Sequence, residues 1–159
     1  MEGMCFNSKK LIKLLIPQTS DTTEIEDMTA MFYGCISVIN LNVSKLAAIS
    51  VKDMNSMFDS CESLCTLDIS NCDTSSLKCI KEMFNDCRSL KTLSAKNCFN
   101  TALFSNKMEN CDLFKGCYNL AKVIADEEVK NILTTFLEQK KGHKILKKCY
   151  IFNVWILRI

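Results

Sequence analysis

Hydrophobic residues recur with a fixed period along most of this chain. A string that begins with Met-Phe and ends with Cys occupies residues 31–35, 57–61 and 83–87, and a Leu-Phe form occupies 113–117. The three Met-Phe strings start 26 residues apart, and the Leu-Phe string follows after 30. Met4 fits the same frame 27 residues before Met31, with Ser8 in the position of the cysteine. The chain therefore contains five repeat units, anchored at Met4, Met31, Met57, Met83 and Leu113.

Each unit is predicted to contain one short helix and one short strand. Before the Met-Phe pair, apolar residues such as Ile25, Met28 and Met31 are three apart, which is typical of one helix face. Gly34 and Gly116 stand where this helix is expected to end. The helix starts are predicted at four capping positions, which are Thr23 with Glu26, Ser50 with Asp53, Asn106 with Glu109, and Ser76.

An L-x-x-L-x-L pattern follows each cysteine and ends in the period-two alternation of a strand. A single unit cannot bury its own apolar stripe, so the units are expected to stack against one another. The predicted fold class is α/β, a leucine-rich-repeat solenoid of about five coils of 26–30 residues, each with one short strand and one short helix.

The unit reads x-x-M-x-x-M-F-x-x-C-x-S-L-x-x-L-x-I-S-x-x-D-T-S, and residues 51–76 are its best copy. This pattern resembles the BspA-like leucine-rich repeat, which occurs in mycoplasma surface lipoproteins and in surface proteins of some parasitic protists. The resemblance covers roughly residues 1–125. It implies a right-handed solenoid with a strand-lined concave face, and a surface or adhesive role.

The chain divides into a repeat region, 1–125, and a C-terminal segment, 126–159, where the repeat register is lost. An amphipathic stripe (Val129, Ile132, Leu133, Phe136 and Leu137) predicts a helix that caps the solenoid, and an apolar stretch follows at 149–159. The alternative for this segment is a basic patch that binds phosphate or anionic lipid, formed by Lys140, Lys141, His143, Lys144, Lys147 and Lys148. We expect no transmembrane segment, since the apolar stretch is shorter than a bilayer requires. No signal peptide is recognised, so the compartment stays open, with cell surface or secretion implied by the resemblance.

The composition bears mainly on chemistry. A net charge of +2 gives no reason to expect a nucleic-acid partner. One histidine and four scattered glycines offer neither a Cys–His dyad nor a phosphate-binding loop, and the closest cysteine pair, Cys61 and Cys65, already belongs to the repeat. We therefore expect no catalytic residues, no cofactor and no metal, and interpret the chain as a non-enzyme. Of the 11 cysteines, the in-phase Cys35, Cys61, Cys87 and Cys117 are expected to be reduced and buried in one ladder.

The expected function is that of a protein–protein interaction module that binds a partner protein on the concave strand face, with surface adhesion as one role. Side chains between the inward leucines must point outward, which gives the candidate binding residues Asn40, Asn42, Ser44, Thr66, Asp68, Ser70, Thr92, Ser94, Lys96 and Lys122. A plain solvated sheet face explains the same residues. The alternative function is an intracellular structural or adaptor repeat protein, or a fragment of a longer array. Partner identity and oligomeric state stay open.

Overall fold

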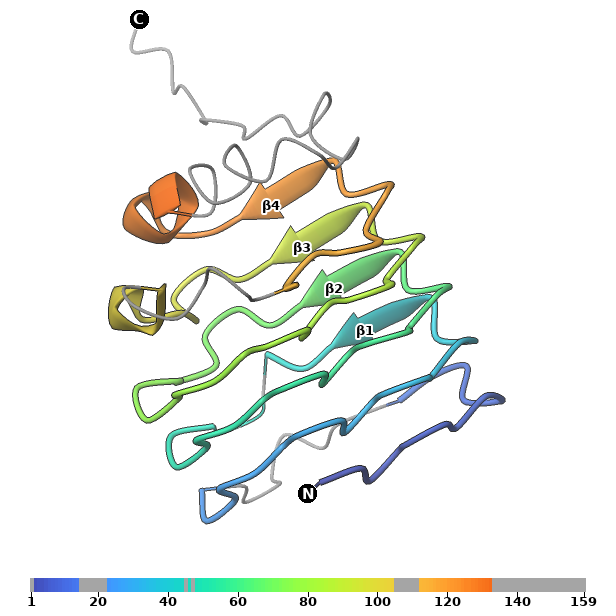
Figure 1. Cartoon of the computed structure of the whole chain (residues 1–159), viewed down its shortest axis with the longest axis horizontal. Coiled ribbons are helices and arrows are strands. Elements are labelled where there is room, and N and C mark those ends of the chain that lie inside the picture. The colour runs from blue at the N-terminus through green and yellow to red at the C-terminus, as the bar shows by residue number, and fades with distance from the viewer. Residues whose placement is uncertain (1, 15–22, 45, 47, 105–111, 133–159) are drawn as a thin grey trace, which may run out of the picture.

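A computed structural model of the chain describes residues 2–14, 23–44, 46, 48–104 and 112–132. Its centre is one parallel sheet in which the strands lie in chain order, β1 (Asn40–Asn42), β2 (Thr66–Asp68), β3 (Thr92–Ser94) and β4 (Lys122–Ile124) (Figure 1). A short 3-10 helix, η1, covers Thr101–Phe104, and residues 127–132 are helical. Successive turns of chain lie over one another from the N-terminal end to β4.

The strands pair in the register that the repeat predicts. Leu41 pairs with Leu67, Leu67 with Leu93, and Leu93 with Val123, so each pairing step equals one repeat. The central leucines are no more than 5% exposed, whereas the residues on either side of them are exposed or half-buried. The prediction of a short half-buried strand after each L-x-x-L is confirmed for these four units.

The prediction of one helix in every unit is wrong, and with it the fold class of five coils that each carry a helix. The described Met-Phe segments consist of consecutive turns, in which Met31 N–H donates to Met28 O (3.3 Å) and Cys35 N–H to Phe32 O (3.1 Å). Between these bonds, Phe32 N–H donates to Met57 O in the next unit at 2.9 Å. Because alternate N–H groups bond across units, the i→i−4 ladder of an α-helix cannot form.

Positive φ angles at fixed positions maintain this arrangement. The third residue of the first turn has φ between 51° and 57° in Ala30, Ser56 and Glu82. A second positive-φ column, which contains Asn7, Gly34, Ser60, Asp86 and Gly116, lies directly before the cysteine or its Ser8 equivalent. Such angles suit the third position of a type II turn and are incompatible with a continuous right-handed helix.

The acids expected to complete helix caps have different roles: Glu26 forms an exposed ion pair with Lys52 at 2.7 Å, and Asp53 starts a turn, as does Asp27, which was not predicted as a capping acid. Asp27 Oδ1 accepts a hydrogen bond from Thr29 N–H at 2.7 Å, and Asp53 Oδ1 accepts one from Asn55 N–H at 2.8 Å. These hydrogen bonds are Asx turns, which begin the series of backbone turns. At the same positions, Asp27 forms a parallel β-bridge with Asp53, and Asp53 forms one with Cys79. The capping pair Asn106 with Glu109 lies outside the described residues.

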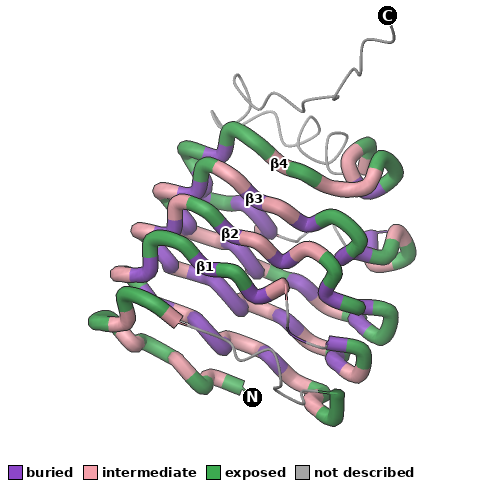
Figure 2. The backbone as a smooth tube through the Cα atoms, turned by 180° about the vertical axis from the view of Figure 1, so that it is seen from behind, coloured by how far each residue is buried: buried purple, intermediate pink, exposed green. Residues whose placement is uncertain are grey.

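The core lies between the sheet and the Met-Phe segments, and buried residues, purple in Figure 2, recur in successive turns of the stack. Met31, Met57 and Met83 are each 1% exposed, and Phe32, Phe58, Phe84 and Phe114 stack in one column. Neighbouring rings in this column lie 5.5, 5.9 and 5.3 Å apart between centroids, within the range that favours aromatic pairs. After β4, Val129 is buried and Ile132 packs on the core, whereas Leu133, Phe136, Leu137 and the rest of the segment lie outside the described residues.

Candidate functional site

The outward side of the sheet, here called the strand face, contains all ten candidate binding residues. Seven of them lie within strands, while Ser44, Ser70 and Lys96 each come two residues after the end of a strand. Two columns cross the sheet in register, Asn40–Thr66–Thr92–Lys122 and Asn42–Asp68–Ser94–Ile124. Every candidate residue is exposed or half-buried.

Some polar side chains of the strand face already form hydrogen bonds within the turns that end the strands. Asn42 Oδ1 accepts from Ser44 N–H at 3.0 Å, and Asp68 Oδ1 accepts from Ser70 N–H at 2.9 Å. Both are Asx turns, which end β1 and β2. Thr66 also donates its hydroxyl to Asn40 Oδ1 at 2.5 Å. These contacts explain the polar residues at the β1–β2 end without a ligand.

The β3–β4 end of the strand face differs. The side chains of Thr92, Lys96 and Lys122 make no hydrogen bond or ion pair with any residue that the structure describes. Lys96 and Lys122 are exposed, while Thr92 is half-buried. Lys91, one residue before Thr92, adds another exposed ammonium group. This end therefore offers a hydroxyl and several cations whose side chains are free to contact a partner.

The interior of the stack contains the predicted cysteine ladder. Cys35, Cys61, Cys87 and Cys117 are buried to 1% exposure or less, and none of the four takes part in a disulfide. Cys61 Sγ donates to Phe32 O at 3.1 Å, Cys87 Sγ to Phe58 O at 3.0 Å, and Cys117 Sγ to Phe84 O at 2.9 Å. Burial raises the pKa of Cys35 to about 11 and that of Cys61 to about 12, so these thiols stay protonated and act as packing groups.

Of the remaining cysteines, Cys72 and Cys98 lie one repeat period of 26 residues apart, and the others share no repeat position. Cys72 and Cys98 are buried and line a cavity of about 10 Å³, which holds at most one water molecule. Cys5, Cys65 and Cys79 are half-buried, and Cys111 and Cys149 lie outside the described residues, as do His143 and the basic patch of the C-terminal segment. The described residues contain no group of three or more His, Cys, Asp or Glu side chains arranged to hold a metal ion.

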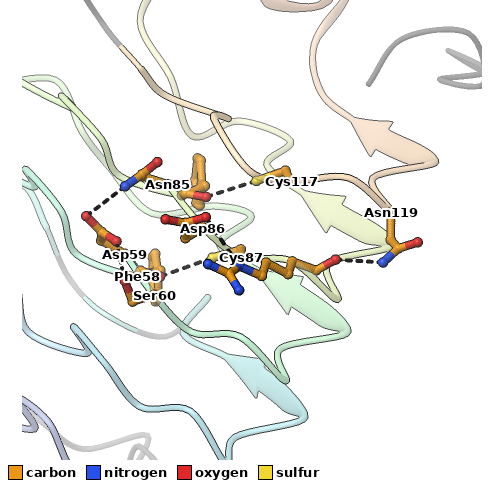
Figure 3. A network of polar contacts seen from close by, with 10 residues as sticks. Phe58, Asp59, Ser60, Asn85, Asp86, Cys87, Cys117 and Asn119 are labelled. Carbon is orange, nitrogen blue, oxygen red and sulfur yellow. Dashed lines mark hydrogen bonds and ion pairs between the residues drawn. The ribbon is translucent and has the colours of Figure 1, made fainter. Parts of the chain in front are cut away.

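A buried carboxyl group lies on the Met-Phe side of the stack and was not predicted (Figure 3). Asp59 is 6% exposed, and its carboxylate accepts from Ser60 Oγ at 2.7 Å and from Asn85 Nδ2 at 3.2 Å. Burial raises the pKa of Asp59 despite these two donors, and the nearby Glu82 and Asp86 raise it further. Asn85 Oδ1 is buried and has no hydrogen-bond partner in the described structure. The only sequence signal was an acid at a position where other units carry Tyr33, Asn85 or Lys115.

Comparison with known proteins bears on the repeat region. Residues 1–126 match the model of a family described as "Mycoplasma protein of unknown function, DUF285". The chain belongs to this family. The family boundary at residue 126 coincides with the point where the repeat register is lost. No curated protein and no solved structure matches the chain. Among the described residues, no helix combines the length and hydropathy needed to cross a membrane.

Proposed function

We propose that this DUF285-family protein is a non-enzymatic interaction module that binds a partner protein on its strand face at a cell surface. The unit pattern supports the finer resemblance to BspA-like surface repeats, and a surface role follows from that resemblance. Stacked repeats commonly use their strand-lined side for extended protein contacts. The proposal includes no catalytic step, since among the described residues the groups whose pKa is raised are thiols and the carboxyl of Asp59.

The observation that carries the proposal is the set of unengaged side chains at the β3–β4 end of the strand face. Thr92, Lys96 and Lys122 come from adjacent turns, and the pairing of β3 with β4 places Thr92 beside Lys122. Their side-chain donors are not used within the described chain, so a partner that accepts hydrogen bonds or carries acids gains contacts without breaking existing ones. The candidate residues include no aromatic anchor, so affinity arises from extended polar contact.

The test is a pair of charge-reversal variants. In the first, Lys96→Glu and Lys122→Glu reverse the two free cations of the strand face. In the control, Lys9→Glu and Lys78→Glu change the same charge at exposed residues away from that face. Each protein is immobilised and exposed to surface extract of the source cells, and the captured proteins are identified and their dissociation constants measured.

We expect the control to retain a saturable partner that the strand-face variant loses by about tenfold or more. Raising the salt concentration should weaken the wild-type complex, since exposed charges are screened. Identical partners and affinities for both variants would exclude the strand face as the binding surface.

A further inference from the structure

Five sulfur-containing side chains line the small cavity in the core of the stack. The cavity has a volume of about 10 Å³, and these residues are Met54, Met57, Cys72, Met83 and Cys98. None of the five is more than 6% exposed. The other described side chains that line the cavity are aliphatic. Because a buried water molecule needs several polar partners, this space suits a group that binds sulfur better than it suits water.

The fold aligns Cys72 and Cys98 so that both side chains reach this cavity. The residues directly before them, Asn71 and Asn97, have φ angles of 58° and 52°. Asn97 Nδ2 donates to Asn71 Oδ1 at 3.0 Å, and Thr74 donates its hydroxyl to Cys98 O. Hydrogen bonds on both sides of Cys72 therefore hold it beside Cys98.

The two thiols also contact each other. Cys72 Sγ donates to Val43 O at 3.3 Å. A hydrogen bond between the side chains of Cys72 and Cys98 lowers the pKa of Cys72 and raises that of Cys98. In the ladder, Cys61 and Cys87 each donate to a backbone carbonyl, and neither lines the cavity. The ladder thiols therefore lack what the Cys72–Cys98 pair has, which is a shared space surrounded by methionine sulfur.

We propose that Cys72 and Cys98 bind one Cu(I) ion in this cavity, with methionine thioethers of the cavity as further ligands. Thiolate and thioether sulfur are soft ligands that select Cu(I), which also accepts low coordination numbers. Zn²⁺ prefers a tetrahedral set of cysteine, histidine and carboxylate ligands, and among the described residues the cavity offers only the two cysteines. Each copper–thiolate bond replaces a thiol S–H bond and releases its proton to solvent, whereas the thioethers bind without adding charge.

The Cu(I) site is separate from the strand face, because its ligands lie in the core. Cys72 belongs to the unit anchored at Met57, and Cys98 belongs to the unit anchored at Met83. A bound ion therefore joins two adjacent units from the inside and is closed to solvent. Such binding stabilises the folded chain, since the unfolded chain does not hold these ligands together.

The test is an anaerobic titration of the reduced full chain with Cu(I), in competition with the coloured chelator bathocuproine disulfonate. The wild type should bind one equivalent tightly, and Cys72→Ala with Cys98→Ala should weaken this binding by about tenfold or more. The matched control is Cys61→Ala with Cys87→Ala, which also removes two buried thiols one repeat apart. The control should bind the tight equivalent as the wild type does.

A second pair of variants tests the thioethers without removing a thiol. Met54→Leu, Met57→Leu and Met83→Leu together should weaken Cu(I) binding and leave the fold intact, because leucine is close to methionine in volume. Met28→Leu with Met31→Leu, at buried positions that do not line the cavity, should have no effect on binding. On the wild type, X-ray absorption at the copper edge should show sulfur ligands alone, and an excess of Zn²⁺ should not displace Cu(I).

The wild-type measurements stand even if a variant does not fold. Absence of a tight equivalent in the wild type, equal loss in the cysteine variant and its control, or unchanged binding in the cavity methionine variant would overturn the proposal. Displacement of Cu(I) by Zn²⁺ would also overturn it, as would a disulfide between Cys72 and Cys98 in the chain isolated anaerobically from its source.

Discussion

Gly34 and Gly116 occupy the same position in their units, yet the structure predicts that alanine is tolerated differently at the two. Both glycines have positive φ, 67° and 78°, so the loss of glycine costs about 1 kcal/mol at either position. Ser60 and Asp86 show that the column accepts a side chain when its neighbour allows it. The difference between the two glycines therefore depends on what the new Cβ meets.

At Gly34 the new Cβ meets the end of the Asn7 side chain, which is exposed and can rotate away, while the Asn7 Cα lies 3.5 Å away in ordinary contact. At Gly116 the Cβ lies 2.9 Å from the Cα of Asp86, so the backbone itself has to move. Forcing atoms into a packed site costs about 1–3 kcal/mol. We therefore expect Gly34→Ala to lower the free energy of unfolding by about 1 kcal/mol and Gly116→Ala by about 2–4 kcal/mol.

The assay is urea unfolding of both variants at 25 °C, followed by circular dichroism, with the slope compared between variants. A second pair sharpens the result. Asn7→Gly should recover the steric part of the Gly34→Ala loss, whereas Asp86→Gly should recover little of the Gly116→Ala loss, since the Asp86 Cα remains. Equal losses at the two glycines, or full recovery by Asp86→Gly, would refute this account of the column.

Three further predictions concern the interior. Phe58→Ala removes the centre of the phenylalanine column and should lower the free energy of unfolding by about 3–5 kcal/mol, whereas Tyr118→Ala, at an exposed ring, should change it by less than about 0.5 kcal/mol; similar losses would contradict the packing described. Because burial raises the pKa of Asp59 above its unfolded value of 3.8, its contribution to stability falls as pH rises through the interval above 3.8, so Asp59→Asn should gain on the wild type between pH 4 and pH 7 in parallel urea titrations; a constant difference across that range would refute the assignment. Thiol titration should find about 11 free thiols in the denatured chain and slow reaction of the ladder cysteines in the native chain, and a count near one would show that disulfides hold the stack.

The strands, their register and the core could be predicted because their signals are local and periodic. Leu67 and its equivalents alternate with polar neighbours, and a 26-residue repeat fixes which leucine faces which. The cysteine ladder followed from the same phase. Its thiol donors to backbone carbonyls could not be predicted, since the carbonyl belongs to the preceding unit.

The helix prediction was wrong for a physical reason that the apolar pattern does not reveal. Met28 and Met31 lie three apart in a helix and also at the two ends of one turn, in which Met31 N–H donates to Met28 O. Both structures place such residues on one side. The helix and the series of turns differ in which carbonyl accepts a hydrogen bond from the other N–H groups. Here Phe32 N–H donates to Met57 O, 25 residues away in the sequence. A window of sequence contains no information on such a bond unless the whole stack is considered.

The sequence also could not separate binding residues from turn residues on the strand face. Short polar residues at a strand end serve either a turn or a ligand, and Asn42 and Asp68 look identical to binding residues in the sequence. Their hydrogen bonds to Ser44 and Ser70 assign them to the turns that end β1 and β2. Substituting Asp68 should therefore reduce stability more than binding, whereas substituting Lys96 should do the opposite, since its side chain supports nothing in the described fold. The proposed binding surface is therefore centred on the β3–β4 end of the sheet and not on its β1–β2 end.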